Sequence, residues 1–274
     1  MFEMVKAVIF GIVEGITEWL PISSTGHLLL LDQFLKLQVP QHFMDQFLVL
    51  IQLGAVFAVI VLYFGQLNPF SLRKDTEEKK TTWLLWAKVV VATIPAGIAG
   101  FFLDDLMDRY LNKWQVIVLA LFVYGVAYVL VERHPERRKT KVDDVDGLSF
   151  PDAIKIGLFQ ALAIVPGTSR SGSTILGGVL CGISRPAAAR FSFFMAIPVM
   201  FGASLLRLVK LGLSYTPAEV LILAIGSVVS FLVSLVVIKK LMAYVRSHSF
   251  AVFGWYRIIL SVVLTVVFLL LRQQ

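Results

Sequence analysis

Two acidic residues near the N-terminus lie in a segment that is otherwise apolar. Glu14 and Glu18 occur in AVIFGIVEGITEWLP, and their spacing of four places both carboxylates on one face of a helix. An acid in a membrane segment indicates a functional site, because a buried charge is expensive there. The pair could bind a divalent cation, Mg²⁺ or Ca²⁺, or share a proton so that one carboxylate acts as a base. A solvated helix face is the simpler alternative.

Hydroxyl groups and an imidazole follow directly, in the sequence PISSTGH at 21–27. After Pro21 and Ile22, this segment consists of Ser23, Ser24, Thr25, Gly26 and His27. If the proline ends one helix and the serines begin another, the N–H groups and dipole of the second helix would favour an anion. Either serine hydroxyl could approach His27, three or four residues later, as a nucleophile approaches its base. A plain N-cap would explain only one of the hydroxyls.

A second polar break occurs far along the chain, in PGTSRSGST at 166–174. Its candidate phosphate-binding residues are Ser169, Arg170, Ser171, Gly172, Ser173 and Thr174. An arginine is always charged and can direct two donors at phosphate oxygens. Burying Arg170 without an anion would be costly, so we expect it to bind phosphate or to pair with Glu14 or Glu18. The segment lacks the G-x-x-x-x-G-K-[ST] pattern of a nucleotide P-loop.

A membrane must hold these residues in place, because the composition excludes a soluble protein. The chain has 274 residues, of which 58% are hydrophobic and 16% charged, with a mean hydropathy of +0.82. Soluble domains are about 45–50% apolar and about 25% charged. The net charge of +7 comes from Lys and Arg between apolar runs, which fits orientation in a lipid bilayer better than a nucleic-acid partner. The single cysteine, Cys181, cannot form an internal disulfide.

Six segments are long and apolar enough to cross the hydrocarbon core as helices. They are residues 44–64, 84–103, 114–132, 188–209, 218–238 and 250–271. The stretches 65–83, 133–155 and 239–249 contain most of the Lys and Arg residues between these spans. Positively charged loops stay in the cytoplasm, so this bias predicts that both ends of the chain face outside.

Residues 4–36 and 152–183 are also apolar, but the two polar breaks interrupt them and each half is too short to span. We expect two re-entrant helical hairpins whose irregular centres are shielded by protein. At an offset close to 145, allowing slips of one residue, Gly11, Glu14, Pro21, Ser24 and Gly26 align with Gly157, Gln160, Pro166, Ser169 and Gly172. The expected fold is therefore an all-α polytopic membrane protein with six transmembrane helices and two re-entrant hairpins. Its single domain, 1–274, would contain two inverted repeats, at about 1–132 and 152–271, with the working site at the midplane.

Three further arginines, Arg185, Arg190 and Arg257, lie near the ends of predicted spans. Long charged side chains in such places usually extend to the membrane interface. We therefore leave these three residues out of the predicted site.

The two polar breaks resemble the signature regions of a known family. EGITEWLPISSTGH at 14–27 and PGTSRSGST at 166–174 are similar to the motifs of the bacterial undecaprenyl-diphosphate phosphatase family of the bacitracin-resistance type. The resemblance extends to IQLGAVFAV at 51–59 and to FGWYR in the last span. It implies removal of the terminal phosphate from the C55 lipid diphosphate, which recycles the lipid carrier of cell-wall synthesis. It also implies the bacterial plasma membrane, a divalent-cation requirement and a site open to the outer face.

The resemblance and the residue chemistry together suggest a role for each residue of the site. Arg170 and the two breaks would hold the diphosphate. Ser24 is the expected nucleophile, Ser23 the second candidate, and a water activated by Glu18 the third. His27 would act as a base toward the hydroxyl or as an acid toward the leaving group.

Glu14 and Glu18 would hold Mg²⁺ or Ca²⁺ and orient the histidine. We expect Ser24→Ala and Arg170→Ala to abolish turnover, and Ser171→Ala to have a mild effect.

Two other functions stay open at this point. A lipid-phosphate flippase would use the same anion-binding breaks, since inverted repeats around a midplane site are common in transporters. It would not need a hydroxyl beside a histidine and paired acids, which favours the enzyme. A purely structural membrane scaffold leaves both polar breaks unexplained. The sequence leaves the metal and the oligomeric state open, with a homodimer among the alternatives.

Overall fold

The computed structural model describes residues 2–111, 113–133, 140–212 and 214–271. Over these residues the chain is helical and forms no strand, apart from one isolated bridge between Val142 and Ile183. The predicted all-α class is confirmed.

Six of the helices are long and apolar enough to cross a membrane. They are α3 (Gln41–Leu62), α5 (Thr76–Tyr110), α6 (Trp114–Arg133), α9 (Arg185–Leu211), α10 (Pro217–Tyr244) and α11 (Ala251–Leu271). The six predicted spans are confirmed, and the chain is a multi-pass membrane protein. Shorter helices, α4 (Phe64–Leu67) and η2 (Val145–Gly147), lie in the connections.

Two pairs of shorter helices surround the polar breaks. The first pair is α1 (Phe2–Thr17) and α2 (Ser24–Phe34), and the second is α7 (Phe150–Ala161) and α8 (Arg170–Leu180), with η3 (Leu162–Ile164) between the last two. Each helix is shorter than the roughly 20 residues that a span requires. Helix α1 ends at Thr17, a full turn before the expected end at Pro21, so Glu18 already belongs to the break.

The second helix of each pair begins with the same strained cap. Ser23 (φ 73°) and Ser169 (φ 70°) are the only residues other than glycine with positive φ among those described. The Ser23 hydroxyl accepts from the Gly26 N–H at 3.3 Å, and the Ser169 hydroxyl accepts from the Gly172 N–H at 3.1 Å. Left-handed backbone is unfavourable for serine, so both caps must be held by their surroundings. The predicted pairing of Ser24 with Ser169 therefore shifts by one residue, because Ser169 is equivalent to Ser23, whereas the predicted pair of Glu14 with Gln160 already has this offset.

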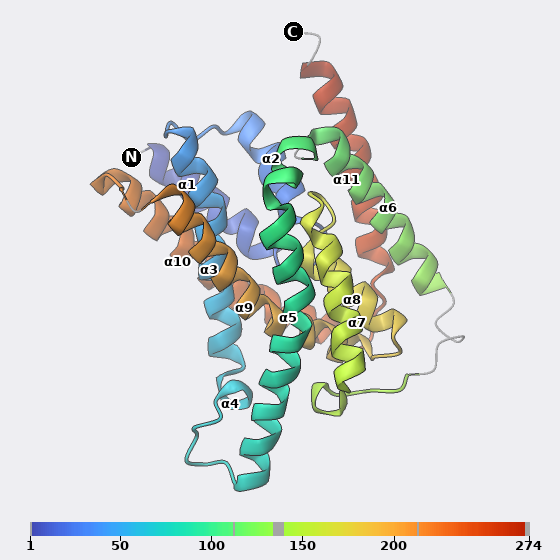
Figure 1. Ribbon diagram of the computed structural model, residues 1–274. Coiled ribbons are helices and arrows are strands. Elements are labelled where there is room, and N and C mark those ends of the chain that lie inside the picture. The colour runs from blue at the N-terminus through green and yellow to red at the C-terminus, as the bar shows by residue number, and fades with distance from the viewer. Residues whose placement is uncertain (1, 112, 134–139, 213, 272–274) are drawn as a thin grey trace.

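The helices of the two halves pack against each other in matching pairs. Helices α1 and α3 contact α10, while α7 and α9 contact α5; α3 also contacts α9, and α6 contacts α11. In Figure 1, α6 and α11 lie together on the right, and α1, α3 and α10 lie on the left. A Cβ on Gly11 would lie 2.5 Å from the Gly226 carbonyl oxygen, and one on Gly157 would lie 2.3 Å from the Ala92 carbonyl oxygen. Both of these glycines therefore allow a close helix contact with the other half.

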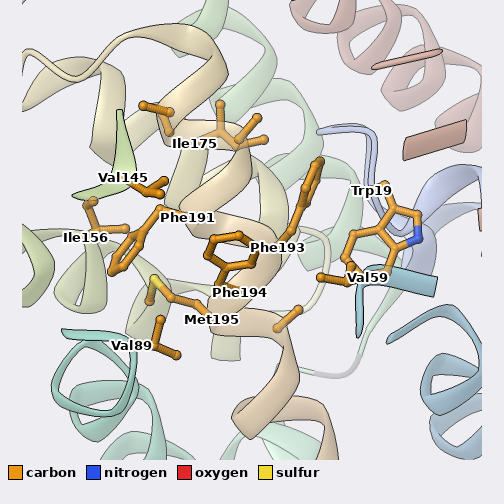
Figure 2. Packing of buried hydrophobic residues seen from close by; sticks show 14 of the residues in the cluster. Trp19, Val59, Val89, Val145, Ile156, Ile175, Phe191, Phe193, Phe194 and Met195 are labelled. Carbon is orange, nitrogen blue, oxygen red and sulfur yellow. The ribbon is translucent and has the colours of Figure 1, made fainter. Parts of the chain in front are cut away.

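The main core surrounds α9. Figure 2 shows Phe191, Phe193 and Phe194 of this helix among buried aliphatic side chains of several other elements. Trp19, from the first break, is fully buried and meets the Phe193 ring edge-on at a centroid distance of 5.3 Å. This contact fixes the first break to the helix that follows the second hairpin.

Candidate active site

The two breaks meet at the carboxylate of Glu18. Arg170 Nη2 donates to Glu18 Oε1 at 2.8 Å, and the Ser24 hydroxyl donates to Glu18 Oε2 at 2.9 Å. Glu18 is 5% exposed and Ser24 9% exposed, so little water competes for these bonds. Charge-assisted hydrogen bonds of this kind are strong when they are buried. One carboxylate thus joins an arginine of the second break to a hydroxyl of the first.

Arg170 is held from several sides. Its Nη1 donates to the Ser192 carbonyl oxygen at 2.8 Å, and its guanidinium lies 5.5 Å from the centre of the Trp19 ring. The Thr174 hydroxyl lies 2.6 Å from the Ser192 hydroxyl and so supports the same contact from α8. These contacts leave the guanidinium little rotational freedom.

Other hydroxyls expected to bind phosphate donate to main-chain carbonyl oxygens. Ser171 donates to the main-chain carbonyl oxygens of Glu18 at 2.9 Å and of Leu20 at 3.2 Å, and Ser173 donates to that of Phe159. Ser171, Ser173 and Thr174 are buried, whereas Thr25 is exposed. Ser171 therefore bonds directly to the other hairpin, which argues against the mild effect expected for its replacement.

His27 has two well-defined partners. Its Nδ1 lies 2.7 Å from the Ser23 carbonyl oxygen and its Nε2 lies 2.7 Å from the Tyr256 hydroxyl. A carbonyl oxygen only accepts, so Nδ1 donates to it, and when the ring is neutral Nε2 accepts from the tyrosine hydroxyl. The expected serine–histidine hydrogen bond is not made here, since Ser24 bonds to Glu18 and the Ser23 hydroxyl caps its own helix. Glu18 is thus the base nearest to Ser24.

The expectation that the Arg257 side chain extends to the membrane interface is wrong. The side chain is fully buried, and it donates to the carbonyl oxygens of Pro21 at 3.3 Å, Gly167 at 2.9 Å and Thr168 at 2.8 Å. Its guanidinium also lies 5.4 Å from the centre of the Tyr124 ring. Arg257 therefore bonds to both breaks at once.

Arg185 and Arg190 behave differently. Arg185 pairs with Glu132, and Arg190 pairs with Asp144 at 3.0 Å, both away from the two breaks. Their omission from the predicted site agrees with their position.

Glu14 is the least satisfied polar residue near the breaks. It is fully buried, and neither of its carboxylate oxygens has a hydrogen-bond partner in the described part of the chain. The Glu18 carboxylate lies close enough to interact with it directly. Two adjacent carboxylates, one of them without partners, offer the oxygen ligands that Mg²⁺ and Ca²⁺ prefer. The residues present therefore fit a divalent cation, although no cluster of three acidic, histidine or cysteine residues occurs among the described residues.

Sequence reasoning missed four residues around the site. They are Trp19, Ser192, Tyr256 and Arg257. Trp19 lies inside the first motif, and Tyr256 and Arg257 lie inside the FGWYR segment, so the motifs themselves carried a signal for three of the four. Ser192 had no such signal, because it contributes mainly its carbonyl oxygen.

Comparison with known proteins shows the family to which the chain belongs. The family model described as "Bacitracin resistance protein BacA" matches residues 7–263. The undecaprenyl-diphosphatase of Limosilactobacillus fermentum is 53% identical over 276 residues, covering 100% of both chains. The protein of the same name from Lactiplantibacillus plantarum is 52% identical, covering 99% of this chain and 100% of its own. That from Enterococcus faecalis strain V583 is 50% identical, covering 94% and 95%. The chain belongs to the bacitracin resistance protein BacA family.

Proposed function

We propose that this protein is an undecaprenyl-diphosphatase. It hydrolyses the anhydride bond of the C55 lipid diphosphate with one water molecule, and the products are the lipid monophosphate and inorganic phosphate. Relatives with this name share about half of its residues over nearly the whole chain. The observation that carries the proposal is the Glu18 carboxylate, which bridges Arg170 and Ser24 at 2.8 and 2.9 Å.

In the proposed first step, the Ser24 oxygen attacks the terminal phosphorus. The hydroxyl proton passes to Glu18, the bond between phosphorus and the bridging oxygen breaks, and the lipid monophosphate leaves. A water molecule then attacks the phosphoserine, which releases inorganic phosphate and restores the serine. Arg170 neutralises the phosphate oxygens, since positioning and charge supply most of the catalysis in phosphoryl transfer. The diphosphate would compete with Glu18 for Arg170, which frees the carboxylate to act as a base.

A divalent cation, Mg²⁺ or Ca²⁺, is part of the proposal. Glu14 and Glu18 would hold it, and when bound it would neutralise negative charge on the diphosphate. Glu14 supports this assignment because a buried carboxylate without partners is costly unless it binds a cation or a proton.

We also propose that the two helix pairs are re-entrant hairpins of an inverted repeat. The short helices, the equivalent caps at Ser23 and Ser169 and the matching helix contacts support this arrangement. The start of α1 and the end of α11 lie at the top of Figure 1, opposite α4 and its Lys- and Arg-rich stretch at 65–83. By the positive-inside rule, we propose that the termini lie outside the bacterial plasma membrane and that the site opens to that face. Residues 134–139 of the basic stretch at 133–155 lie outside the described residues.

A lipid-phosphate flippase is the competing function, and the matching contacts of the two halves favour it, since alternating access commonly uses such repeats. The test is release of inorganic phosphate by the purified protein with lipid diphosphate and Mg²⁺ or Ca²⁺. We expect release by the wild type and at most about 1% of that rate in Ser24→Ala and Arg170→Ala, since the first variant lacks the proposed nucleophile and the second loses an electrostatic contribution of about 100-fold or more. Intact lipid binding without release under any metal would favour the flippase.

A further inference from the structure

A lateral groove between α5, η3 and α9 leads to Arg170. Its volume is about 670 Å³, within the range of roughly 300–1,000 Å³ typical of ligand pockets. Its apolar lining includes Gly97, Phe101, Ala163, Pro198, Gly202 and Leu206. Gln160 and Arg170 also line it and are largely buried, whereas Phe101, Leu205 and Val209 are well exposed. The groove therefore has a buried polar end and an open apolar end.

The side chain of Gln160 has no partner for its oxygen or its nitrogen among the described residues, although the residue is only 2% exposed. A buried amide without partners is costly, and proteins rarely retain one without a reason. The amide group can donate two hydrogen bonds, which suits an anionic ligand. Arg170 Nε also lacks a partner among the described residues, although both terminal nitrogens are bonded. Because Gln160 and Arg170 line the same groove, an anionic ligand there could accept from the Gln160 amide and from Arg170 Nε.

Three helical glycines of the groove wall have no packing explanation. A Cβ on Gly97, Gly100 or Gly202 would meet nothing within 4 Å, and none of the three has a positive φ. At Gly157, by contrast, the close approach to Ala92 requires glycine. Glycine destabilises a helix interior relative to alanine, so these three positions carry a cost without a contact to offset it. Their effect is to keep the groove wide.

We propose that this groove binds the diphosphate end of the prenyl lipid. The Gln160 amide donates to a phosphate oxygen beside Arg170, and the first part of the prenyl chain runs outward past Phe101 and Val209 into the bilayer. A buried cation and amide followed by an apolar channel match an anionic head joined to a hydrocarbon tail. The proposal rests on the proposed function and adds a substrate-binding residue and a path for the chain.

An amide also suits position 160 better than a carboxylate does. Gln160 aligns with Glu14 of the first hairpin, which we assign to a cation. A carboxylate at position 160 would repel the diphosphate in the groove. At the two aligned positions, the Glu14 carboxylate would thus bind the metal and the neutral Gln160 amide would bind the anionic phosphate.

The first arm of the test replaces Gln160 and measures phosphate release from the C55 diphosphate and from its C15 homologue, farnesyl diphosphate. Gln160→Leu should raise KM about tenfold or more for both lipids, because a hydrogen bond to a charged phosphate is lost. Gln160→Glu should raise KM further. Thermal unfolding of each purified variant shows whether the fold is retained.

The second arm narrows the groove with Gly202→Leu. This change should raise KM several-fold for both lipids, because the first part of either prenyl chain lies in the groove beside Gly202. Gly65→Leu is the matched control, since Gly65 also has open space around its Cβ position but lies in α4, outside the groove. It should change neither KM.

Measuring the affinity for a non-hydrolysable prenyl diphosphonate distinguishes failure of the groove proposal from failure of the proposed function. If wild-type protein binds the analogue but releases no phosphate from either lipid, the proposed function fails and the groove is still tested by the variants' affinities. If the wild type turns over, and Gln160→Leu and Gly202→Leu both match it in KM and in analogue affinity, the groove proposal is wrong.

Discussion

Arg257→Lys should slow the enzyme strongly while leaving its fold intact. Arg257 makes three hydrogen bonds, one to the Pro21 carbonyl oxygen and two to those of Gly167 and Thr168. Lysine keeps the charge, but its single nitrogen cannot span both breaks as the guanidinium fork does. A hydrogen bond from a charged donor contributes about 1.5–3 kcal/mol. Loss of one such bond between the breaks corresponds to roughly a 10- to 150-fold lower population of the assembled site.

The assay is phosphate release from lipid diphosphate by purified protein, with kcat and KM determined separately. Because Arg257 acts through the backbone of both breaks, kcat/KM should fall roughly 10- to 150-fold while helix content by circular dichroism stays unchanged. Arg190→Lys is the matched control, since Arg190 pairs with the exposed Asp144 and such pairs contribute about 0–1 kcal/mol. Equal kcat/KM values for Arg257→Lys and Arg190→Lys would refute the reasoning.

Three further predictions concern the contacts around the breaks. Ser171→Ala should lower phosphate release about tenfold, because it removes hydrogen bonds to the first break, whereas Thr81→Ala, at an exposed hydroxyl of α5 outside both breaks, should stay near wild type; equal rates would contradict this. With Glu18 as the base, the role that remains for His27 is that of acid toward the leaving group, so Tyr256→Phe, which removes the partner of His27 Nε2, should alter the pH profile of kcat; an unchanged profile would count against that role. Chelation should stop phosphate release until Mg²⁺ or Ca²⁺ is restored, and Glu14→Gln should raise the metal concentration required by about tenfold or more; turnover that withstands chelation would exclude the metal.

The spans could be predicted from sequence because apolar length alone determines them. All six predicted spans coincide with long helices, but their ends differ. The segment predicted at 84–103 lies within a helix that runs over Thr76–Tyr110. Hydropathy reports only the part suited to lipid, whereas charged residues such as those at 77–80 continue the helix beyond it.

The meeting of the two breaks could also be predicted, because an arginine and a glutamate that are both buried need each other. Of the two acids that the sequence offers as a partner of Arg170, Glu18 forms the ion pair. The partner of Ser24 could not be predicted, because residue spacing gives reach but not orientation. Because helix α1 ends at Thr17, Glu18 lies in the break, where its carboxylate accepts the hydrogen bond from the Ser24 hydroxyl that the sequence predicts for His27.

The burial of Arg257 could not be predicted either. Its place near the end of an apolar run indicates the membrane interface, whereas its true surroundings depend on how α11 packs beside both hairpins. Such a contact between segments far apart in sequence is set by the tertiary fold. A local pattern of hydropathy carries no information about it.

The most direct test of a site shared by Ser24, Glu18 and Arg170 is to map the phosphorylated residue. Purified protein is mixed with lipid diphosphate labelled on its terminal phosphate, quenched in acid, digested and analysed by mass spectrometry, with Ser24→Ala and Arg170→Ala beside the wild type. We expect the label on Ser24 in the wild type and no label in either variant. A label on His27, or full phosphate release by Ser24→Ala, would contradict the proposed site.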